Sequence, residues 1–184
     1  MGKLVVTEFI SLDGVIEEPG WSFEFNRGDE GEKFKGDELL AADAQLLGRV
    51  TYQGFAQAWP TMEGTSWFGE KMNSMPKYVV STTLTDAQAD WNNSTVIRDH
   101  VADNVSRIKK EVAGDILVAG SAQLVQSLAG DDLVDEYHLM VYPIVLGTGK
   151  RLFGEGIRRT KLRLVDSQSA GPDGIQILTY QPVR

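Results

Sequence analysis

The chain has 184 residues, which is enough for a single domain, residues 1–184, with a hydrophobic core of its own. It contains no cysteine and only two histidines, so disulfides, thiolate catalysis and the usual zinc frameworks are excluded, and no metal site is predicted. The net charge of −8, with no basic run to offset it, argues against nucleic acid and anionic membranes as partners.

The N-terminal segment, MGKLVVTEFISLDG, has a strand pattern and lacks the features of a signal peptide. No apolar run in the chain reaches the roughly 18 residues of a membrane span, so we expect a cytoplasmic protein. β-branched and aromatic residues dominate positions 3–11, which predicts a strand covered on both faces. Residues 13–32 are rich in Gly, Pro and acids and predict a long structured loop, and a helix is expected from about Asp29 to Ala42.

The next part of the chain alternates between strand and helix patterns. A buried strand ends at Leu47, and a short helix is expected over residues 51–55. Residues 58–76 predict a second long connection. The segments KYVVS and STVI predict two further strands. The helix expected after them has apolar residues at helical spacing, namely Val101, Val105, Ile108 and Val112.

The C-terminal third changes from alternating elements to strands alone. The segment DILVAG predicts a strand, followed by a helix, SAQLVQSLAG, that Gly130 closes. Three strand patterns then follow without a helix between them, at residues 134–146, 160–170 and 174–182. The whole pattern predicts an α/β domain with a mostly parallel central sheet, helices on both faces and antiparallel strands at the C-terminal end.

Two of the predicted strands lead directly into helices through a glycine turn. In open α/β sheets, ligands bind outside the carboxyl ends of the strands. Gly48 lets a ligand approach the backbone, and the helix that opens at residues 49–51 offers free N–H groups to an anion. Residues 120–122 repeat this arrangement, so the pair predicts a cradle for a pyrophosphate. The alternative is that both glycines only permit tight turns, with Thr51 and Ser121 as helix caps.

A third turn carries three consecutive hydroxyl residues at positions 81–83, and no acidic residue follows before Asp86. A pocket that selects NAD commonly places a carboxylate against the ribose 2′-hydroxyl, whereas hydroxyls and a nearby arginine can accept a 2′-phosphate. Ser81 and Thr82 therefore favour NADPH, although a hydroxyl run after a strand also occurs as ordinary loop chemistry. Two other phosphate-binding motifs, the Walker A loop and the GxGxxG fingerprint, are absent.

Five segments in this order make the chain resemble the dihydrofolate-reductase-like fold, and most closely the reductase domain of bacterial riboflavin biosynthesis and its stand-alone relatives. They are SLDGVIE, LLGRVTY, MPKYVVSTTL, ILVAGSAQLVQSL and DEYHLMVYPIVLGTGKRLF. The resemblance implies a homodimeric, NADPH-dependent reductase that transfers hydride to a small polar substrate. This substrate is either 5-amino-6-(5-phosphoribosylamino)uracil or that of an unassigned relative. The alternatives are a dihydrofolate reductase and a non-catalytic NADPH-binding module.

The resemblance also implies roles for individual residues. Those that match cofactor-binding segments are Gly48, Arg49, Val50, Thr51, Ser81, Thr82, Ala119, Gly120, Ser121, Ala122, Gln123 and Leu124. The resemblance places Asp13 beside the nicotinamide and the substrate, where it could bond substrate hydroxyls, or donate a proton if burial raises its pKa. Gly14 and Trp21 are expected on the substrate side. The alternatives are an ordinary Asp-Gly turn and aromatic packing of Trp21, Phe23 and Phe25 without a ligand.

Two positions depart from dihydrofolate reductases. The Gly-Gly pair that carries a cis peptide bond in those enzymes corresponds to Ala119-Gly120 here, which leaves open whether a cis bond is kept. The buried carboxylate that binds the pteridine has three candidates here, Glu30, Glu32 and Asp37. No apolar pattern surrounds them, so we expect them on a solvated face.

Overall fold

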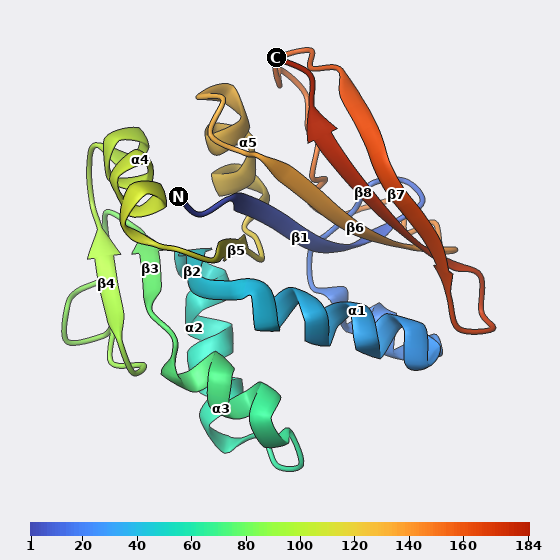
Figure 1. Ribbon diagram of the computed structural model, residues 1–184, viewed down its shortest axis with the longest axis horizontal. Coiled ribbons are helices and arrows are strands. Elements are labelled where there is room, and N and C mark those ends of the chain that lie inside the picture. Colours follow the sequence, from blue (N-terminus) through green and yellow to red (C-terminus); the bar gives the residue numbers. More distant parts are fainter.

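The side chains of β1 (Leu4–Ser11) alternate between two hydrophobic layers, which places this strand at the centre of the molecule. Leu4 and Val6 belong to a large cluster on one face, and Val5 belongs to a second cluster on the other. In the computed structural model, which describes residues 1–184, all eight strands form one sheet with the order β4-β3-β2-β5-β1-β6-β8-β7 (Figure 1).

Apart from the segment after α2, the helices and strands follow one another in the order that the sequence pattern indicates. The other strands are β2 (Ala42–Gly48), β3 (Lys77–Val80), β4 (Ser94–Ile97), β5 (Asp115–Val118), β6 (Glu136–Tyr142), β7 (Leu162–Ala170) and β8 (Ile175–Pro182). The α-helices are α1 (Gly28–Ala41), α2 (Arg49–Ala58), α3 (Ser66–Ser74), α4 (Val101–Glu111) and α5 (Ala122–Gly130). Two 3-10 helices are η1 (Pro19–Glu24) and η2 (Trp59–Thr61).

The sheet is parallel from β4 to β6, and β8 pairs antiparallel with both β6 and β7. Helices α1, α2 and α3 cover one face, and α4 and α5 cover the other (Figure 1). Leu39 of α1 and Met72 of α3 pack with Val5, whereas Ile108 of α4 and Leu128 of α5 pack with Leu4. The predicted mostly parallel sheet with antiparallel C-terminal strands is confirmed.

The segment after α2 differs from the prediction, because residues 58–76 contain η2 and α3 rather than a plain connection. The α3 sequence, SWFGEKMNS, is poor in strong helix formers, so its helix depends on tertiary packing. Met72 is buried, and the Phe68 ring stacks on Trp59 with 5.6 Å between centroids. Helix α2 is also longer than predicted, because it begins at Arg49 and continues to Ala58. None of the helices combines the length and hydrophobicity that a membrane crossing requires.

Candidate functional site

Three of the predicted turns lie side by side at one edge of the sheet. Strands β3, β2 and β5 are neighbours and parallel, so their carboxyl ends meet at the same edge. Gly48 lies opposite Val80, the last residue before the Ser81 turn. The Gly48 N–H donates to the Gly120 carbonyl oxygen at 3.4 Å. The structure therefore brings the turns at positions 48, 81 and 120 together.

The turns at Gly48 and Gly120 fit closely against each other. A Cβ atom on Gly48 would lie 2.8 Å from the Ser121 hydroxyl oxygen and 3.2 Å from the Ser121 nitrogen, so a side chain there would displace the second turn. Gly120 has a φ of +86°, which strongly favours glycine, and a Cβ on it would lie 3.0 Å from the Thr51 hydroxyl. These contacts explain why both positions require a residue without a side chain.

Helices α2 and α5 both begin at the contact between these two turns. Helix α2 begins at Arg49 without a side-chain cap, whereas Ser121 caps α5 by accepting from the Leu124 N–H at 3.4 Å. Of the two residues predicted to cap helices, only Ser121 therefore does so. Thr51 lies within the first turn of α2. The remaining free N–H groups of both first turns make this edge suitable for an anion with more than one phosphate.

The cis peptide bond of this region joins Gly120 and Ser121. It is not at Ala119-Gly120, the pair that corresponds to the cis Gly-Gly pair of dihydrofolate reductases. Around it, Ala122 and Leu124 are buried in the larger core cluster, so only their backbone groups can serve a ligand. Gln123 is exposed. Ala119 packs at the edge of the cluster that contains Leu47 and Tyr52.

The Ser81 turn is held by its own first hydroxyl. The buried Ser81 oxygen accepts from the Thr83 N–H at 3.2 Å and from the Leu84 N–H at 3.0 Å. Thr82 is exposed and has no hydrogen-bond partner for its hydroxyl. Ser81 therefore shapes the turn, and Thr82 is the hydroxyl that remains free for a ligand.

Two arginines flank these turns. Arg98 follows β4 and donates to the Leu84 carbonyl oxygen at 3.0 Å and to Asp86 at 2.9 Å. The first carboxylate after β3 is thus already paired with a cation. Arg49 is exposed and donates to Gln53 one helical turn further along α2. Val50 is also exposed, and it carries no polar group toward the turn.

Asp13 bonds the loop after β1 to the loop after β6. Its Oδ1 accepts from the Ser11 hydroxyl at 2.6 Å and from the Leu146 N–H at 3.1 Å, and its Oδ2 accepts from the Gly147 N–H at 2.8 Å. The Ser11 hydroxyl and these two N–H groups lower the pKa of Asp13 to about 2. The proton-donor role depended on a raised pKa, so that part of the prediction is wrong. The substrate role of Asp13 stays a prediction.

The substrate side predicted from Gly14 and Trp21 adjoins this cross-link. Gly14 has a φ of +84° in the turn that Asp13 closes. A cleft of about 470 Å³ lies beside it. Its lining residues are Val15, Glu17, Glu18, Trp21, Leu146, Thr148 and Gly149. Trp21 therefore reaches a cavity, but it also packs edge-on against Tyr142 at 5.4 Å between ring centroids.

The other two loop aromatics behave differently. Phe25 packs against Tyr142 with 5.5 Å between ring centroids, whereas Phe23 is 90% exposed and touches no aromatic partner. Packing thus explains Phe25, and Trp21 combines packing with access to the cleft.

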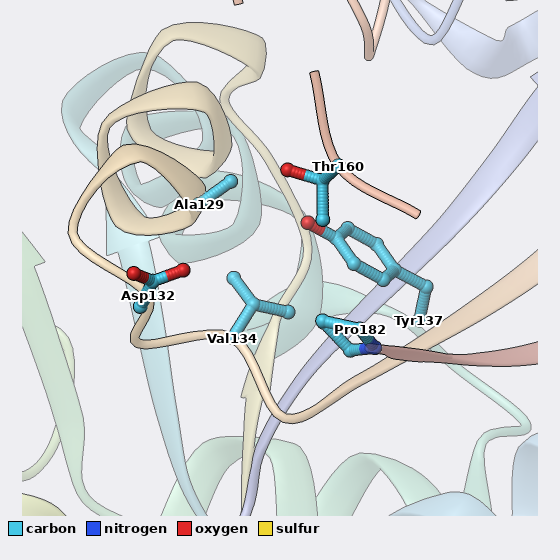
Figure 2. A pocket seen from close by; sticks show the side chains of 6 residues that line it. All are labelled: Ala129, Asp132, Val134, Tyr137, Thr160 and Pro182. Carbon is cyan, nitrogen blue, oxygen red and sulfur yellow. The ribbon is translucent and has the colours of Figure 1, made fainter. Parts of the chain in front are cut away.

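A second, much smaller cavity of about 10 Å³ lies at the opposite edge of the sheet (Figure 2). Val134, Tyr137 and Pro182 line it, near the beginning of β6 and the end of β8. Asp132 at its rim pairs with Arg158, so this arginine lies far from the three turns. Arg151 lies beside the cleft loops, because its Nε donates to the Asp13 carbonyl oxygen at 3.0 Å.

Two acidic residues that the sequence analysis missed lie near this region. Glu8 of β1 is partly buried, and its Oε1 is a fully enclosed atom without a hydrogen-bond partner. Burial raises the pKa of Glu8 to about 8, although Lys35 opposes the shift. The sequence signal was a single carboxylate inside an otherwise apolar strand.

The second is Glu38 on α1, which is buried and bonded on both sides. Its Oε1 lies 2.8 Å from the His138 Nδ1, and its Oε2 accepts from Lys35, which also donates to Thr7. Burial alone would raise the pKa of Glu38, but Lys35 and His138 lower it to about 2. The three carboxylates that the sequence offered instead, Glu30, Glu32 and Asp37, are exposed. A group of His, Cys, Asp and Glu residues arranged to hold a metal is absent.

Comparison with known proteins extends these observations. Residues 2–176 match the family described as the RibD C-terminal domain. The Bacillus subtilis (strain 168) protein YwjB is 31% identical over 174 residues, which cover 92% of this chain and 92% of that protein.

Two solved structures show the same fold. A putative riboflavin biosynthesis protein from Shewanella sp. PV-4 has a TM-score of 0.79 at 21% identity, with both chains fully covered. The dihydrofolate reductase from Enterococcus faecalis, in a complex with NADP(H), has a TM-score of 0.64 at 14% identity, covering 100% of this chain and 98% of that one. The dihydrofolate-reductase-like fold is therefore confirmed.

Proposed function

The chain belongs to the RibD C-terminal domain family, and from this membership we propose that it is an NADPH-dependent reductase that transfers hydride to a small polar substrate. The observation that carries the proposal is the contact between the Gly48 and Gly120 turns, where two helix N-termini open at the carboxyl edge of the sheet. The free N–H groups there would hold the pyrophosphate of the dinucleotide. The cofactor supplies the hydride, and the protein orients it and excludes water.

The preference for NADPH over NADH is supported by the neighbouring turn. Thr82 offers a free hydroxyl and Arg98 a cation, while the nearby Asp86 is paired with Arg98. A 2′-phosphate next to these groups would gain a charge-assisted hydrogen bond. A ribose without the phosphate would lose this interaction.

Titration of the protein with NADPH and with NADH tests this proposal. We expect micromolar binding of NADPH, measured by fluorescence quenching, and affinity for NADH that is at least about tenfold weaker, since one charged hydrogen bond contributes that much. Equal affinity for the two nucleotides would contradict the preference. Absence of binding by either would contradict the reductase itself.

The substrate that we propose is a ribosylaminopyrimidine, with 5-amino-6-(5-phosphoribosylamino)uracil as the first compound to test. The cleft beside Asp13 is large enough for a small polar molecule, and Arg151 is an exposed cation next to it. Oxidation of NADPH, followed by absorbance, is expected with this pyrimidine and not with dihydrofolate. Turnover of dihydrofolate would identify a dihydrofolate reductase, and binding of NADPH without oxidation by any pyrimidine, pterin or carbonyl compound would identify a non-catalytic module.

We further propose that two copies of the chain associate through β7. This strand is at the end of the sheet, and its residues from Arg163 to Ser169 are exposed, including the apolar Leu164 and Val165. A long edge strand with exposed apolar side chains is a template for a second strand. We expect a dimer in analytical ultracentrifugation that Val165→Arg disrupts and that Leu40→Glu, at an exposed apolar position on α1, leaves intact. A monomeric natural protein would contradict this assignment.

A further inference from the structure

The ladder between β1 and β5 ends before β1 does. Val6 is the last residue of β1 that pairs with β5, opposite Val118, whereas the ladder with β6 continues to Ser11. After Val6, β1 therefore has no strand on its β5 side, and the chain after β5 turns away at Gly120. We call this interruption of the sheet, between residues 7–11 and the turn at Gly120, the β1–β5 break.

Glu8 lies at the β1–β5 break, beside the Gly120 turn. Its Oε1 is enclosed and makes no hydrogen bond of normal geometry, although the Gly120 N–H is near enough to lower the pKa of Glu8. The same atom lies 3.8 Å from the position of a Cβ on Gly120, so it is directly against the turn that contacts Gly48. Buried polar atoms in folded proteins almost always have a hydrogen-bond partner. Glu8 Oε1 lacks such a partner, and it lies next to the turn where the proposed cofactor would bind.

The charged groups near Glu8 come from one side only. Helix α1 contributes Lys35, which lowers the pKa of Glu8, and Glu38, which raises it, and neither is hydrogen-bonded to Glu8. The elements on the other side contribute Gly120 and Thr51, which carry no charge, although the Gly120 N–H also lowers the pKa of Glu8. The electrostatic environment of Glu8 would therefore change most if a charged ligand arrived from the side of the turn.

The position of Glu8 follows the order of strands that the proposed dinucleotide would cross. With its 2′-phosphate at the Ser81 turn next to β3 and its pyrophosphate between the turns of β2 and β5, the rest of the molecule reaches the next strand, β1. That remainder is the nicotinamide riboside. Resting on the proposed function, we infer that Glu8 hydrogen-bonds the nicotinamide end of the bound cofactor, as a neutral acid with NADPH and as a carboxylate with NADP⁺.

The difference between the two cofactor forms lies in the charge of the ring. The NADPH ring is neutral and accepts a hydrogen bond from the Glu8 carboxyl through its carboxamide oxygen. The NADP⁺ ring carries a positive charge, which stabilises the carboxylate by Coulomb attraction. Binding of NADP⁺ then releases the Glu8 proton to solvent, so that the neutral acid plus NADP⁺ gives the carboxylate–NADP⁺ complex plus H⁺. Since burial raises the pKa of free Glu8 to about 8, this release is expected at neutral pH.

Titration calorimetry of the full chain at pH 7, in two buffers that differ in ionisation enthalpy, counts the protons directly. We expect release of about one proton per NADP⁺ bound and none per NADPH. The ratio of the two dissociation constants, Kd(NADPH)/Kd(NADP⁺), should rise by at least about twentyfold between pH 6.5 and pH 9. The ratio cancels titration of the 2′-phosphate, which both nucleotides carry.

The variants Glu8→Gln and Glu111→Gln separate the role of Glu8 from general effects. In Glu8→Gln the ratio should stay constant with pH and NADP⁺ should bind about tenfold more weakly at pH 9, while NADPH binding is kept. Glu111 is an exposed residue of α4, so its variant should behave like the natural protein. Binding of both nucleotides with a pH-independent ratio and no proton release would overturn this inference alone. Failure of both nucleotides to bind would overturn the proposed function.

Discussion

The carboxyl edge of the sheet has two different ends. The turns after β3, β2 and β5 present backbone N–H groups and small residues. The loops after β1 and β6 present side chains that are bonded to the protein itself. Gly48 and Gly120 meet at the first end through a backbone hydrogen bond. Asp13 at the second end has both oxygens occupied by its own loops. The first end is therefore arranged for a ligand, and the second supports the loops that surround the cleft.

Two carboxylates of the β1 region show the same contrast. Glu8 is enclosed without a hydrogen bond and has a pKa raised to about 8, whereas Asp13 accepts three hydrogen bonds and has a pKa lowered to about 2. The two residues are five positions apart in the chain. Their surroundings, and not the type of side chain, thus determine which of them can exchange a proton near neutral pH.

The largest effect is expected where α1 is bonded to β6. The change Glu38→Gln leaves His138 and Lys35 without their shared carboxylate and should lower the free energy of unfolding by about 3 kcal/mol. Urea unfolding monitored by circular dichroism measures this loss. The neighbouring Asp37→Asn, at an exposed position, should cost less than about 0.5 kcal/mol.

The pH dependence of that loss tests its electrostatic origin. The lowered pKa of Glu38 contributes stability that is present above 4.5 and is lost as the pH falls toward 2. Burial opposes the charge of His138, but its bonds to Glu38 and Glu136 raise its pKa, so its contribution is present below 6.5 and is lost at higher pH. The difference between the natural protein and Glu38→Gln should therefore be greatest between these values. A constant difference from pH 2 to pH 9 would refute this explanation.

The next largest effect is expected at the contact between the two glycine turns. Gly48→Ala forces a Cβ to within 2.8 Å of the Ser121 hydroxyl, and we expect a loss of about 1–3 kcal/mol of stability together with at least about tenfold weaker NADPH binding. Gly54 in the same helix has open space at its Cβ position, so Gly54→Ala should stabilise the protein by about 0.5–1 kcal/mol and keep NADPH binding. Equal binding by the two variants would show that the turn does not hold the cofactor.

A smaller effect concerns the proposed 2′-phosphate contact. Thr82→Val removes one exposed hydroxyl and should weaken NADPH binding by about three- to tenfold, the contribution of one hydrogen bond, without changing NADH binding. Thr95→Val, at an exposed position within β4, serves as the matched control. If both nucleotides lose affinity equally in Thr82→Val, this hydroxyl does not distinguish them.

The smallest effect at neutral pH should come from Asp13→Asn, which keeps the shape of the side chain but weakens the cross-link. The lowered pKa of Asp13 contributes stability that is present above 3.8 and is lost as the pH falls through about 2. The melting temperatures of the natural protein and the variant should therefore approach each other as the pH is lowered from 5 to 2. The exposed Asp90→Asn is the control and should show no such convergence.

Much of the fold follows from local sequence patterns. The buried strands show runs of apolar residues, and α4 shows its apolar residues at helical spacing, as with Val105 and Ile108. The helix α3 has no such signal, because its weak helix formers depend on packing with residues far along the chain.

The glycine turns of the site could be predicted from the sequence, whereas the protonation states of its carboxyl groups could not. Gly48 and Gly120 mark the ends of strands, and a strand end is visible in a sequence. The states of Glu8, Asp13 and Glu38 depend on partners that other elements bring to them, such as Leu146 for Asp13 and His138 for Glu38. A single sequence does not show which acidic residue will find such partners. The buried Glu38 could therefore not be distinguished from the exposed acidic residues of α1.

The central position of β1 has a consequence for the synthesis of the protein. Its partners in the sheet are β5, beginning opposite Leu4 at Ile116, and β6, beginning opposite Val5 at Glu136. Strand β1 thus remains unpaired until β5 and β6 have been translated. A nascent chain that holds an apolar strand for this time is exposed to aggregation and to chaperones, and the native sheet can close only when the C-terminal third arrives.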